Sequence, residues 1–493
     1  MPYLMARPLI ADPGSIRIWV GLFDVTSVPP ITFSINERSS QPVDGQGLFA
    51  IRDDEFLAGT PRNYQGVYKF KALGDDQEHR ITVTADGAAD PFFLPVKSLP
   101  ARVSTEFSDS FKILLASCYC VSTDTTDVGH FVNRLRITPD ISLFAGDQVY
   151  LDQPPGQTMP SAPAALRADI SAKYRRNWLS QWTSQRGLQQ ALARAPAICL
   201  PDDHEYWNNY PWEQFWKRGT QHKPTATGLN HWDDAARELF QDYQLGGNPG
   251  TQQPWTTLDI DPLCMLFIDT RSHRQLDFKS PTGLMPAAAN VALMTWKDKL
   301  IRHQSHGTPH IGVLATGQSL LSQPSRLPKM MDAELANYET HYSMIIDVLE
   351  ELAVHRIQVV LLTGDVHWNR VAQAKNRRTF RTCLTEVICS PSSLCVIPVL
   401  DQWASIKNMF KSIFGANETW FRHSEPDAFK KPIGNNRQFL PNEESKTLWK
   451  GNHVAIIEFI KRNGGVNMKV TYHPLTSTPT SAVSTGFYSL LNT

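Results

Sequence analysis

The sequence lacks any apolar run that reaches the roughly 18 residues of a membrane-spanning helix. It also lacks an excess of either charge, because 48 basic and 48 acidic side chains balance. This balance argues against nucleic acid or an anionic membrane as the main partner. The opening residues, MPYLMARPLIADPG, contain no basic segment followed by a long apolar one. We therefore see no secretory signal and expect either a cytoplasmic protein or the processed form of a secreted one.

Several enzyme signatures are also missing. No G-x-x-x-x-G-K-[ST] phosphate loop is present, and the G-x-G in VDGQGLFA lies in a β-rich stretch with no helix after it. We therefore expect no ATP, nicotinamide or flavin cofactor. The absence of H-E-x-x-H and of G-x-S-x-G argues against a zinc peptidase and a serine esterase. The seven cysteines lack the spacing of a zinc ribbon, and several lie in apolar runs, so we expect most of them to be reduced.

The N-terminal part of the chain has the sequence pattern of an all-β domain. The chain has 493 residues, of which 41% are apolar, and this length suggests about two to three domains, or one large domain with an appendage. Residues 1–105 contain short β-branched or aromatic runs separated by Pro, Gly, Asn and Asp. Such spacing predicts a small β-sandwich of the fibronectin or immunoglobulin kind over this range.

The rest of the chain alternates between apolar strands and stretches of helical periodicity, which predicts a layered α/β domain over residues 106–475. The predicted strands are Ile113–Ser117, Ile141–Ala145, Ala197–Leu200, Leu263–Asp269, Ile311–Thr316 and Gln358–Thr363. A final hairpin is expected from His453–Phe459 and Val466–Tyr472. We expect insertions near residues 152–196, 206–260 and 400–450, and a loose tail at residues 476–493.

Four of the predicted strands end in side chains that can bind metal. These ends carry Cys118, Asp147, the run Asp202–Glu205, and the pair Asp365 and His367. In layered α/β folds, ligands bind beyond the carboxyl ends of the strands. A single polar strand end is an ordinary turn, whereas four ends with ligand residue types indicate one shared site.

Carboxylates that converge repel one another unless a cation neutralises them. Asp147, Asp203 and Asp365 beside His367 and Cys118 would therefore be unstable without metal. Carboxylate and imidazole suit a divalent or trivalent ion, and two ions can share a bridging carboxylate. A phosphate ester is the natural electrophile for such a pair, because bridged metals activate water and hold the oxygens of an in-line displacement.

The motifs GDQVYLD, DDHEYWNNY, GDVHW and DTRSHR resemble those of the metallophosphoesterase superfamily, and specifically its alkaline phosphatase D (PhoD-like) branch. The sequence departs from the general superfamily pattern at Cys118, Asp203 and Asp365. These departures are the ones that mark the PhoD-like branch. The resemblance covers about residues 110–370 and implies a four-layer α/β/β/α sandwich, preceded by the small all-β sandwich.

The resemblance also implies roles for single residues. Asp147 would bridge two metals, with Cys118, Tyr150 and His367 on one of them. Asp365 and either Asp203 or Asn209 would hold the other. The implied ions are Fe³⁺ and Ca²⁺, with Mn²⁺, Zn²⁺ and Mg²⁺ as alternatives. His204 matches the catalytic histidine, Glu205 is a candidate for orienting it, and Arg271 is a candidate phosphate clamp or else a structural ion pair.

We therefore expect a metal-dependent hydrolase of phosphoric esters, a phosphomonoesterase with phosphodiesterase activity as a further option, that uses a metal-bound hydroxide or oxide as nucleophile. The alternatives are a phosphodiesterase or phospholipase-D-type enzyme on the same site, and a binding protein that has lost catalysis. The expected partner is a small phosphate ester, with no nucleic acid and no transmembrane segment. The sequence does not specify the substrate or the oligomeric state.

Overall fold

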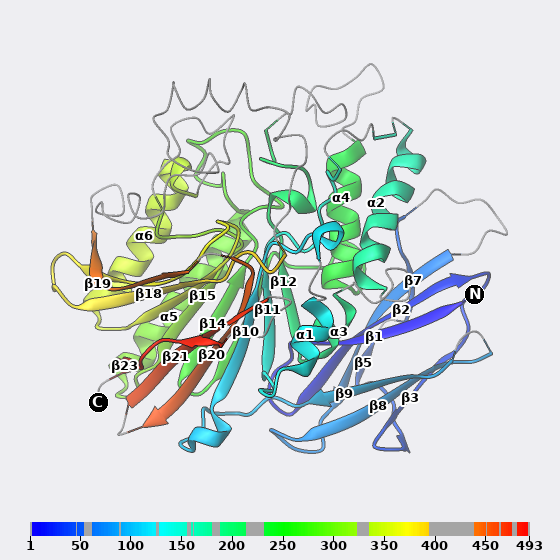
Figure 1. Ribbon diagram of the computed structural model, residues 1–493, viewed down its shortest axis with the longest axis horizontal. Helices are drawn as coiled ribbons and strands as arrows, with labels where there is room; N and C mark the ends of the chain where they lie inside the picture. The colour runs from blue at the N-terminus through cyan, green and yellow to red at the C-terminus, as the bar shows by residue number, and fades with distance from the viewer. Residues whose placement is uncertain are drawn as a thin grey trace.

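The computed structural model describes residues 2–45, 47–53, 62–87, 90–124, 128–154, 159–160, 162–179, 188–212, 231–322, 335–393, 438–449, 451–462, 465–475 and 481–491. Within these residues, two large sheets face each other, and helices cover the outer face of each (Figure 1). The predicted four-layer α/β/β/α architecture is therefore confirmed. No helix in the described ranges is both long and apolar enough to cross a membrane.

The first sheet combines the N-terminal strands, three parallel central strands and the C-terminal hairpin. Its central strands are β10 (Phe111–Ala116), β11 (Ile141–Ala145) and β12 (Ala197–Leu200), which pair in parallel. The predicted hairpin is present as β20 (His453–Arg462) and β21 (Gly465–Pro474), and β20 pairs with β10. On the other side lie β1 (Tyr3–Leu9), β2 (Ser15–Val25), β5 (Asp44–Gly45), β6 (Phe49–Ala50) and β7 (Arg62–Lys71).

The second sheet has a parallel core with antiparallel edges. Its parallel strands are β14 (Leu263–Ile268), β15 (Ile311–Ala315), β16 (Val359–Thr363) and β18 (Thr382–Ile388). The edges are β13 (Trp255–Ile260) on one side, and β17 (Asn369–Asn376) and β19 (Phe439–Trp449) on the other. Continuous apolar runs form these central strands because both of their faces are buried.

Three apolar cores hold the layers together. The inner faces of the two sheets meet in one core that contains Leu143, Leu200, Val313 and Leu362. The outer face of the first sheet packs on α1 (Val128–Arg134), α2 (Pro163–Trp178), α3 (Gln189–Ala193) and α4 (His231–Phe240). The outer face of the second packs on α5 (Ala287–Ser305) and α6 (Glu339–Val354).

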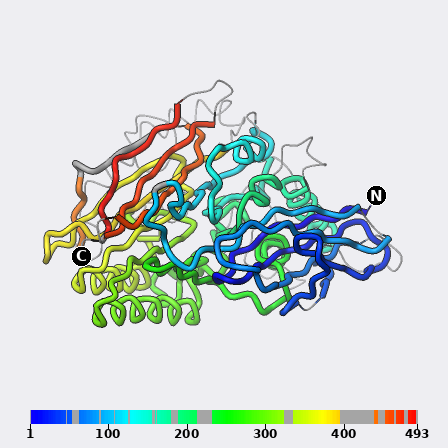
Figure 2. The backbone as a smooth tube through the Cα atoms, turned by 90° about the horizontal axis from the view of Figure 1, so that it is seen from below, coloured from blue at the N-terminus to red at the C-terminus, as the bar shows by residue number. Residues whose placement is uncertain are grey.

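The N-terminal residues do form two layers, but one of them is continuous with the first sheet. A small sheet of β3 (Ile31–Ile35), β4 (Arg38–Ser39), β8 (Glu78–Ala85) and β9 (Phe92–Lys97) packs on β1, β2 and β7 through an apolar core. β1 also pairs in parallel with β12, at Leu9 and Ala197. Figure 2 shows these N-terminal strands at one end of the molecule and β20 and β21 at the other. The domain boundary at residue 105 stays a prediction.

The regions predicted to be insertions or tail contribute strands and helices. The described part of residues 476–493 is not loose, because β22 (Val483–Ser484) and β23 (Tyr488–Leu491) pair with β21. The Ser- and Thr-rich composition concealed this pairing, which depends on the exposed edge that β21 offers. Residues 152–196 carry α2 and α3, and residues 206–260 carry α4 and β13. Most of residues 400–450 lie outside the described residues, but β19 joins the second sheet.

Candidate metal centre at the strand ends

The predicted site residues follow strands of both sheets. Cys118 follows β10, Asp147 follows β11 and Asp203 follows β12, all in the first sheet. Asp365 and His367 follow β16 in the second sheet. We call these five residues the carboxylate centre. The two parallel sets of strands bring their carboxyl ends to one edge, as the sequence predicted.

The backbone of the centre is held in an uncommon conformation. Cys118, Asp147, Asp365 and His367 have positive φ angles of 52°, 57°, 67° and 59°, and Asn209 has φ 64°. Such left-handed backbone costs a residue with a side chain about 1–3 kcal/mol, and it concentrates at functional sites. The strain is a second indication of function, independent of the motifs.

The glycine of one G-D motif is required by the close approach of the two sheets. A Cβ atom on Gly364 would lie 2.1 Å from the carbonyl oxygen of Ala145 and 2.5 Å from the Cβ of Ser117. Only glycine therefore lets β16 end against β10 and β11. The contact places Asp365 beside the carboxyl ends of β10 and β11.

The donor atoms converge in three overlapping groups. Within each group the ligand atoms lie within 4.8 Å of one another. The groups are Cys118, Asp147 and His367; Asp147, Asp203 and His204; and Asp147, Asp202, Asp203 and Asp365. Asp147 belongs to all three and is fully buried, which is the position expected of a carboxylate between two ions. Asp202 was not among the predicted ligands.

The electrostatics of the centre fit a cation. Burial raises the pKa of the Asp147 carboxyl well above its ordinary value, and Asp203, Asp365 and Glu205 raise it further against the opposing effect of His204. Burial, with Asp147 and Asp365, likewise raises the pKa of the Cys118 thiol. The Oδ2 atom of Asp202 is buried and has no hydrogen-bond partner among the described residues. A cation would satisfy this oxygen and stabilise the charged forms of all these groups.

The thiol of Cys118 is held by groups that the motifs did not reveal. The Ser390 hydroxyl donates to Cys118 Sγ at 3.1 Å and accepts from the His367 backbone N–H at 3.1 Å. The thiol itself lies 3.5 Å from Asp147 Oδ2. On the other side, Gln318 Nε2 donates to Asp365 Oδ2 at 3.1 Å. Gln318 follows β15, so the rule that found the other strand ends could have found it too.

His204 is oriented by Asp152 rather than by Glu205. Its Nδ1 lies 2.9 Å from Asp152 Oδ1, while the other Asp152 oxygen accepts the backbone N–H of Asn208 at 3.0 Å. The imidazole also lies on the Tyr150 ring, with ring centroids 4.1 Å apart. Burial lowers the pKa of His204, but Asp152, Asp203 and Asp147 together raise it well above its ordinary value.

Glu205 has a structural role in the turns that follow β11 and β12. Its carboxylate accepts backbone N–H groups from Asp147, Gln148, Val149 and Asp202, at 2.6–3.1 Å. The suggestion that Glu205 orients His204 is therefore wrong. Asp152 is the last residue of the GDQVYLD motif, but no local sequence pattern predicts that it pairs with His204.

Arg271 is paired with a carboxylate in the protein interior. Its Nε donates to Asp202 Oδ1 at 2.5 Å and its Nη1 to the Tyr210 carbonyl at 2.7 Å, and the side chain is fully buried. This geometry favours the structural ion pair over the phosphate clamp, because the guanidinium is committed to protein acceptors.

The two remaining predicted ligands also lie in the site. Tyr150 is 7% exposed and contacts His204, and the Asn209 backbone N–H donates to Asp203 Oδ2 at 2.6 Å. Cys120 is buried against Tyr150.

Comparison with known proteins agrees with this geometry. The sequence model of the PhoD-like phosphatase family matches residues 114–409, which is more than half of the chain. The solved structure of PhoD matches with a TM-score of 0.57 and 14% identity, over 99% of this chain and 92% of that one. A β-glucuronidase from Bacteroides uniformis has a TM-score of only 0.21 at 7% identity, over 99% of this chain and 60% of that one, and indicates nothing about the fold. No curated protein sequence matches the chain. On the family match, which includes every strand end of the centre, the chain belongs to the PhoD-like phosphatase family.

Proposed function

We propose that the chain hydrolyses phosphoric monoesters with two metal ions held at the carboxylate centre. The observation that carries this proposal is the convergence of three ligand groups on the buried Asp147, in a chain that belongs to a phosphatase family. Bound ions would supply Lewis acidity and lower the pKa of a coordinated water molecule. The protein residues hold the ions, orient the ester and move a proton.

The ligand types divide the centre into two unlike sides. Cys118 and His367 lie with Asp147 on one side, and we assign Tyr150 to the same side. Thiolate, phenolate and imidazole favour a ferric ion there. Asp203 and Asp365 lie with Asp147 on the other side, where oxygen ligands suit calcium, and we assign Asn209 to it as well. Asp202, held by Arg271, is a further oxygen on this side.

We assign the proton transfer to His204. Asp152 engages Nδ1, so the carboxylate fixes the ring and leaves Nε2 for the leaving oxygen of the ester. The buried carboxylates around the ring favour its protonated form, which is the form that an acid needs. Arg271 acts on the site through Asp202 as a positioning residue.

Paired assays test this function and its alternatives. The full chain, purified without chelator, should turn over a chromogenic phosphomonoester faster than the matching diester, and chelation should abolish both activities. Faster diester turnover would favour the phosphodiesterase or phospholipase-D-type alternative. No turnover of either ester by protein that contains metal would favour a binding protein.

A further inference from the structure

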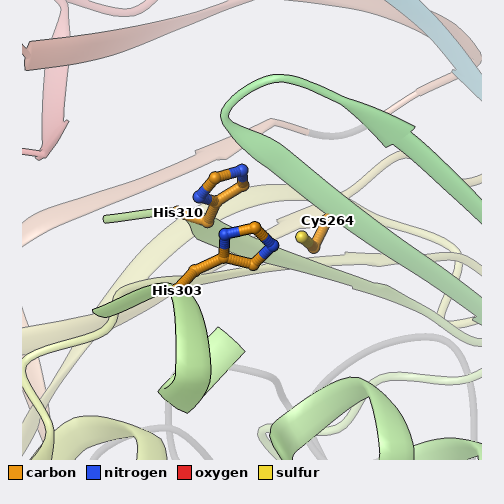
Figure 3. A group of neighbouring side chains, drawn as sticks. All are labelled: Cys264, His303 and His310. Atoms are coloured by element: carbon orange, nitrogen blue, oxygen red, sulfur yellow. The ribbon is translucent and has the colours of Figure 1, made fainter. Parts of the chain in front are cut away.

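A second group of metal-ligand side chains lies at the opposite edge of the second sheet. Cys264, His303 and His310 each offer a ligand atom, and these atoms lie within 4.8 Å of one another. We call this group the thiol–imidazole cluster. Figure 3 shows a ring nitrogen of His303 facing the Cys264 sulfur, with the His310 ring beside it.

Regular secondary structure positions the three side chains. Cys264 is the second residue of β14, and His310 directly precedes β15, which pairs with β14. Both therefore lie at the amino end of strands whose carboxyl ends face the carboxylate centre. Six residues of strand span roughly 20 Å, so the two sites are separate. His303 lies in the last turn of α5, on the face that packs Trp296 and Leu300 against the sheet.

Hydrogen bonds to Thr308 leave the same nitrogen available on both rings. His310 Nδ1 lies 2.7 Å from the Thr308 carbonyl oxygen, so Nδ1 carries the proton and donates. Thr308 Oγ1 donates to the His303 carbonyl at 3.2 Å, and can therefore accept from His303 Nδ1 at 3.3 Å. On a neutral His303 ring Nε2 is then a lone pair, whereas His310 Nε2 faces Asp261 Oδ1 at 3.4 Å, so a cation bound there would replace a proton shared with that carboxylate. Imidazoles that bind metal are typically fixed in this way by a partner on the other nitrogen.

The charges around the cluster favour a cation. His310 Nε2 lies 3.4 Å from Asp261 Oδ1, whereas Asp259, the cross-strand partner of Cys264, is already ion-paired with Lys299. The C-terminal end of α5 adds the negative end of a helix dipole. Burial, then His310 and Lys299, lower the pKa of His303 against the opposing effect of Asp259 and Asp261. Burial and Asp259 raise the pKa of the Cys264 thiol to about 12, so binding must release a proton from it.

We propose that Cys264, His303 and His310 bind a divalent thiophilic cation of the zinc type, independently of the carboxylate centre. One thiolate and two imidazoles are a typical zinc ligand set. Three protein ligands leave a fourth position for water. Both histidines are partly exposed, whereas Cys264 is 1% exposed.

Cobalt substitution distinguishes the two sites, because each contains one cysteine. The full chain is titrated with Co²⁺, and the thiolate-to-cobalt charge-transfer band is recorded. Part of the band should persist in Cys118→Ser, this part should disappear when Cys264→Ser is added to that variant, and Zn²⁺ should displace the cobalt. His303→Gln should weaken zinc binding at least about 100-fold, and Thr308→Val about 10-fold. His306→Gln is the matched control, because His306 is exposed at the end of the same helix and lies outside the cluster.

Two results would overturn the proposal. A band that survives Cys264→Ser but is lost in Cys118→Ser would place all thiolate-bound cobalt at the carboxylate centre. Equal losses of zinc affinity in His306→Gln and His303→Gln would indicate adventitious binding to surface imidazoles. Because Cys264 is buried, Cys264→Ala serves as a second variant, and the thermal midpoint of each variant shows whether it has folded.

Discussion

The carboxylate centre lies at the carboxyl ends of strands from both sheets, the thiol–imidazole cluster lies at the amino ends of β14 and β15 in the second sheet, and the two are built in different ways. Cys118, Asp147, Asp365 and His367 sit in turns with left-handed backbone, and the first three are almost completely buried. Cys264 and His303 lie within a regular strand and helix, and both histidines of the cluster are partly exposed.

The difference reflects the charge that each site must hold. Several carboxylates inside a protein require short connections from several strands, and such turns impose strained dihedral angles. A thiol and two imidazoles can be neutral without metal, so ordinary elements can carry them at little cost. A change at the carboxylate centre should therefore affect turnover far more than a change at the cluster.

The largest effect is expected from Asp147→Asn. This change removes a charge from all three ligand groups and should abolish turnover together with metal binding. Metal analysis of the purified variant, alongside the monoester assay, measures both. Retention of two ions with normal turnover would show that Asp147 does not bridge.

His204→Ala should separate catalysis from metal binding. We expect turnover to fall about 10²–10⁴-fold, the usual contribution of a general acid or base, while the metal content stays unchanged. Metal content and activity are measured on the same preparation. If the two decrease in parallel, His204 is a ligand and not an acid.

Asp152→Asn should have a smaller effect, because it leaves the imidazole in place. We expect turnover to fall about 10–100-fold, with kcat affected more than KM, since the carboxylate orients His204 without contacting the ester. Asp169→Asn, on the outer helix α2, is a matched control for loss of one carboxylate. A change in KM alone would contradict this positioning role.

Tyr150→Phe tests the identity of one ion. If Tyr150 is a phenolate ligand of ferric iron, the wild type is coloured, and the variant should lose or shift its visible band with at most about a 10-fold loss of turnover. The ring stays in contact with His204, so the fold should be unaffected. A colourless, active, iron-free wild type would exclude iron and leave the phosphatase proposal intact.

The smallest effect on turnover is expected from Cys264→Ala. The two sites share no ligand, and distant sites act independently, so kcat/KM for the monoester should stay within about twofold of wild type. The steady-state assay uses protein with its carboxylate centre loaded. A large loss of turnover would mean that the two sites are coupled, and would contradict their independence.

The sequence predicted the carboxylate centre because its ligands follow a local rule. Each apolar strand is a recognisable run, and each ends in a short motif, so Asp147, Asp203 and Asp365 could be placed at one edge without coordinates. The same rule would also have selected Gln318 after β15, which was missed because its role depends on a contact with Asp365 that the sequence does not specify.

Contacts between distant segments could not be predicted from the sequence. The partner of His204 is Asp152 and not the adjacent Glu205, since the turn directs the Glu205 carboxylate to backbone N–H groups. Arg271 was found by its motif, but its pairing with Asp202 depends on how β12 and β14 approach one another. The strands in the predicted tail were missed because they are only two and four residues long and pair with an edge formed elsewhere.

The sequence by itself determined the layered α/β fold, the family and the residue types of the carboxylate centre, because hydrophobic periodicity and strand-end motifs are local signals. Only the tertiary structure shows that the N-terminal strands continue the first sheet, that Asp152 pairs with His204, and that Cys264 lies close to His303 and His310. These outcomes depend on strand register and on the packing of α5 against β14, and both are decided by the burial of surfaces far apart in the chain.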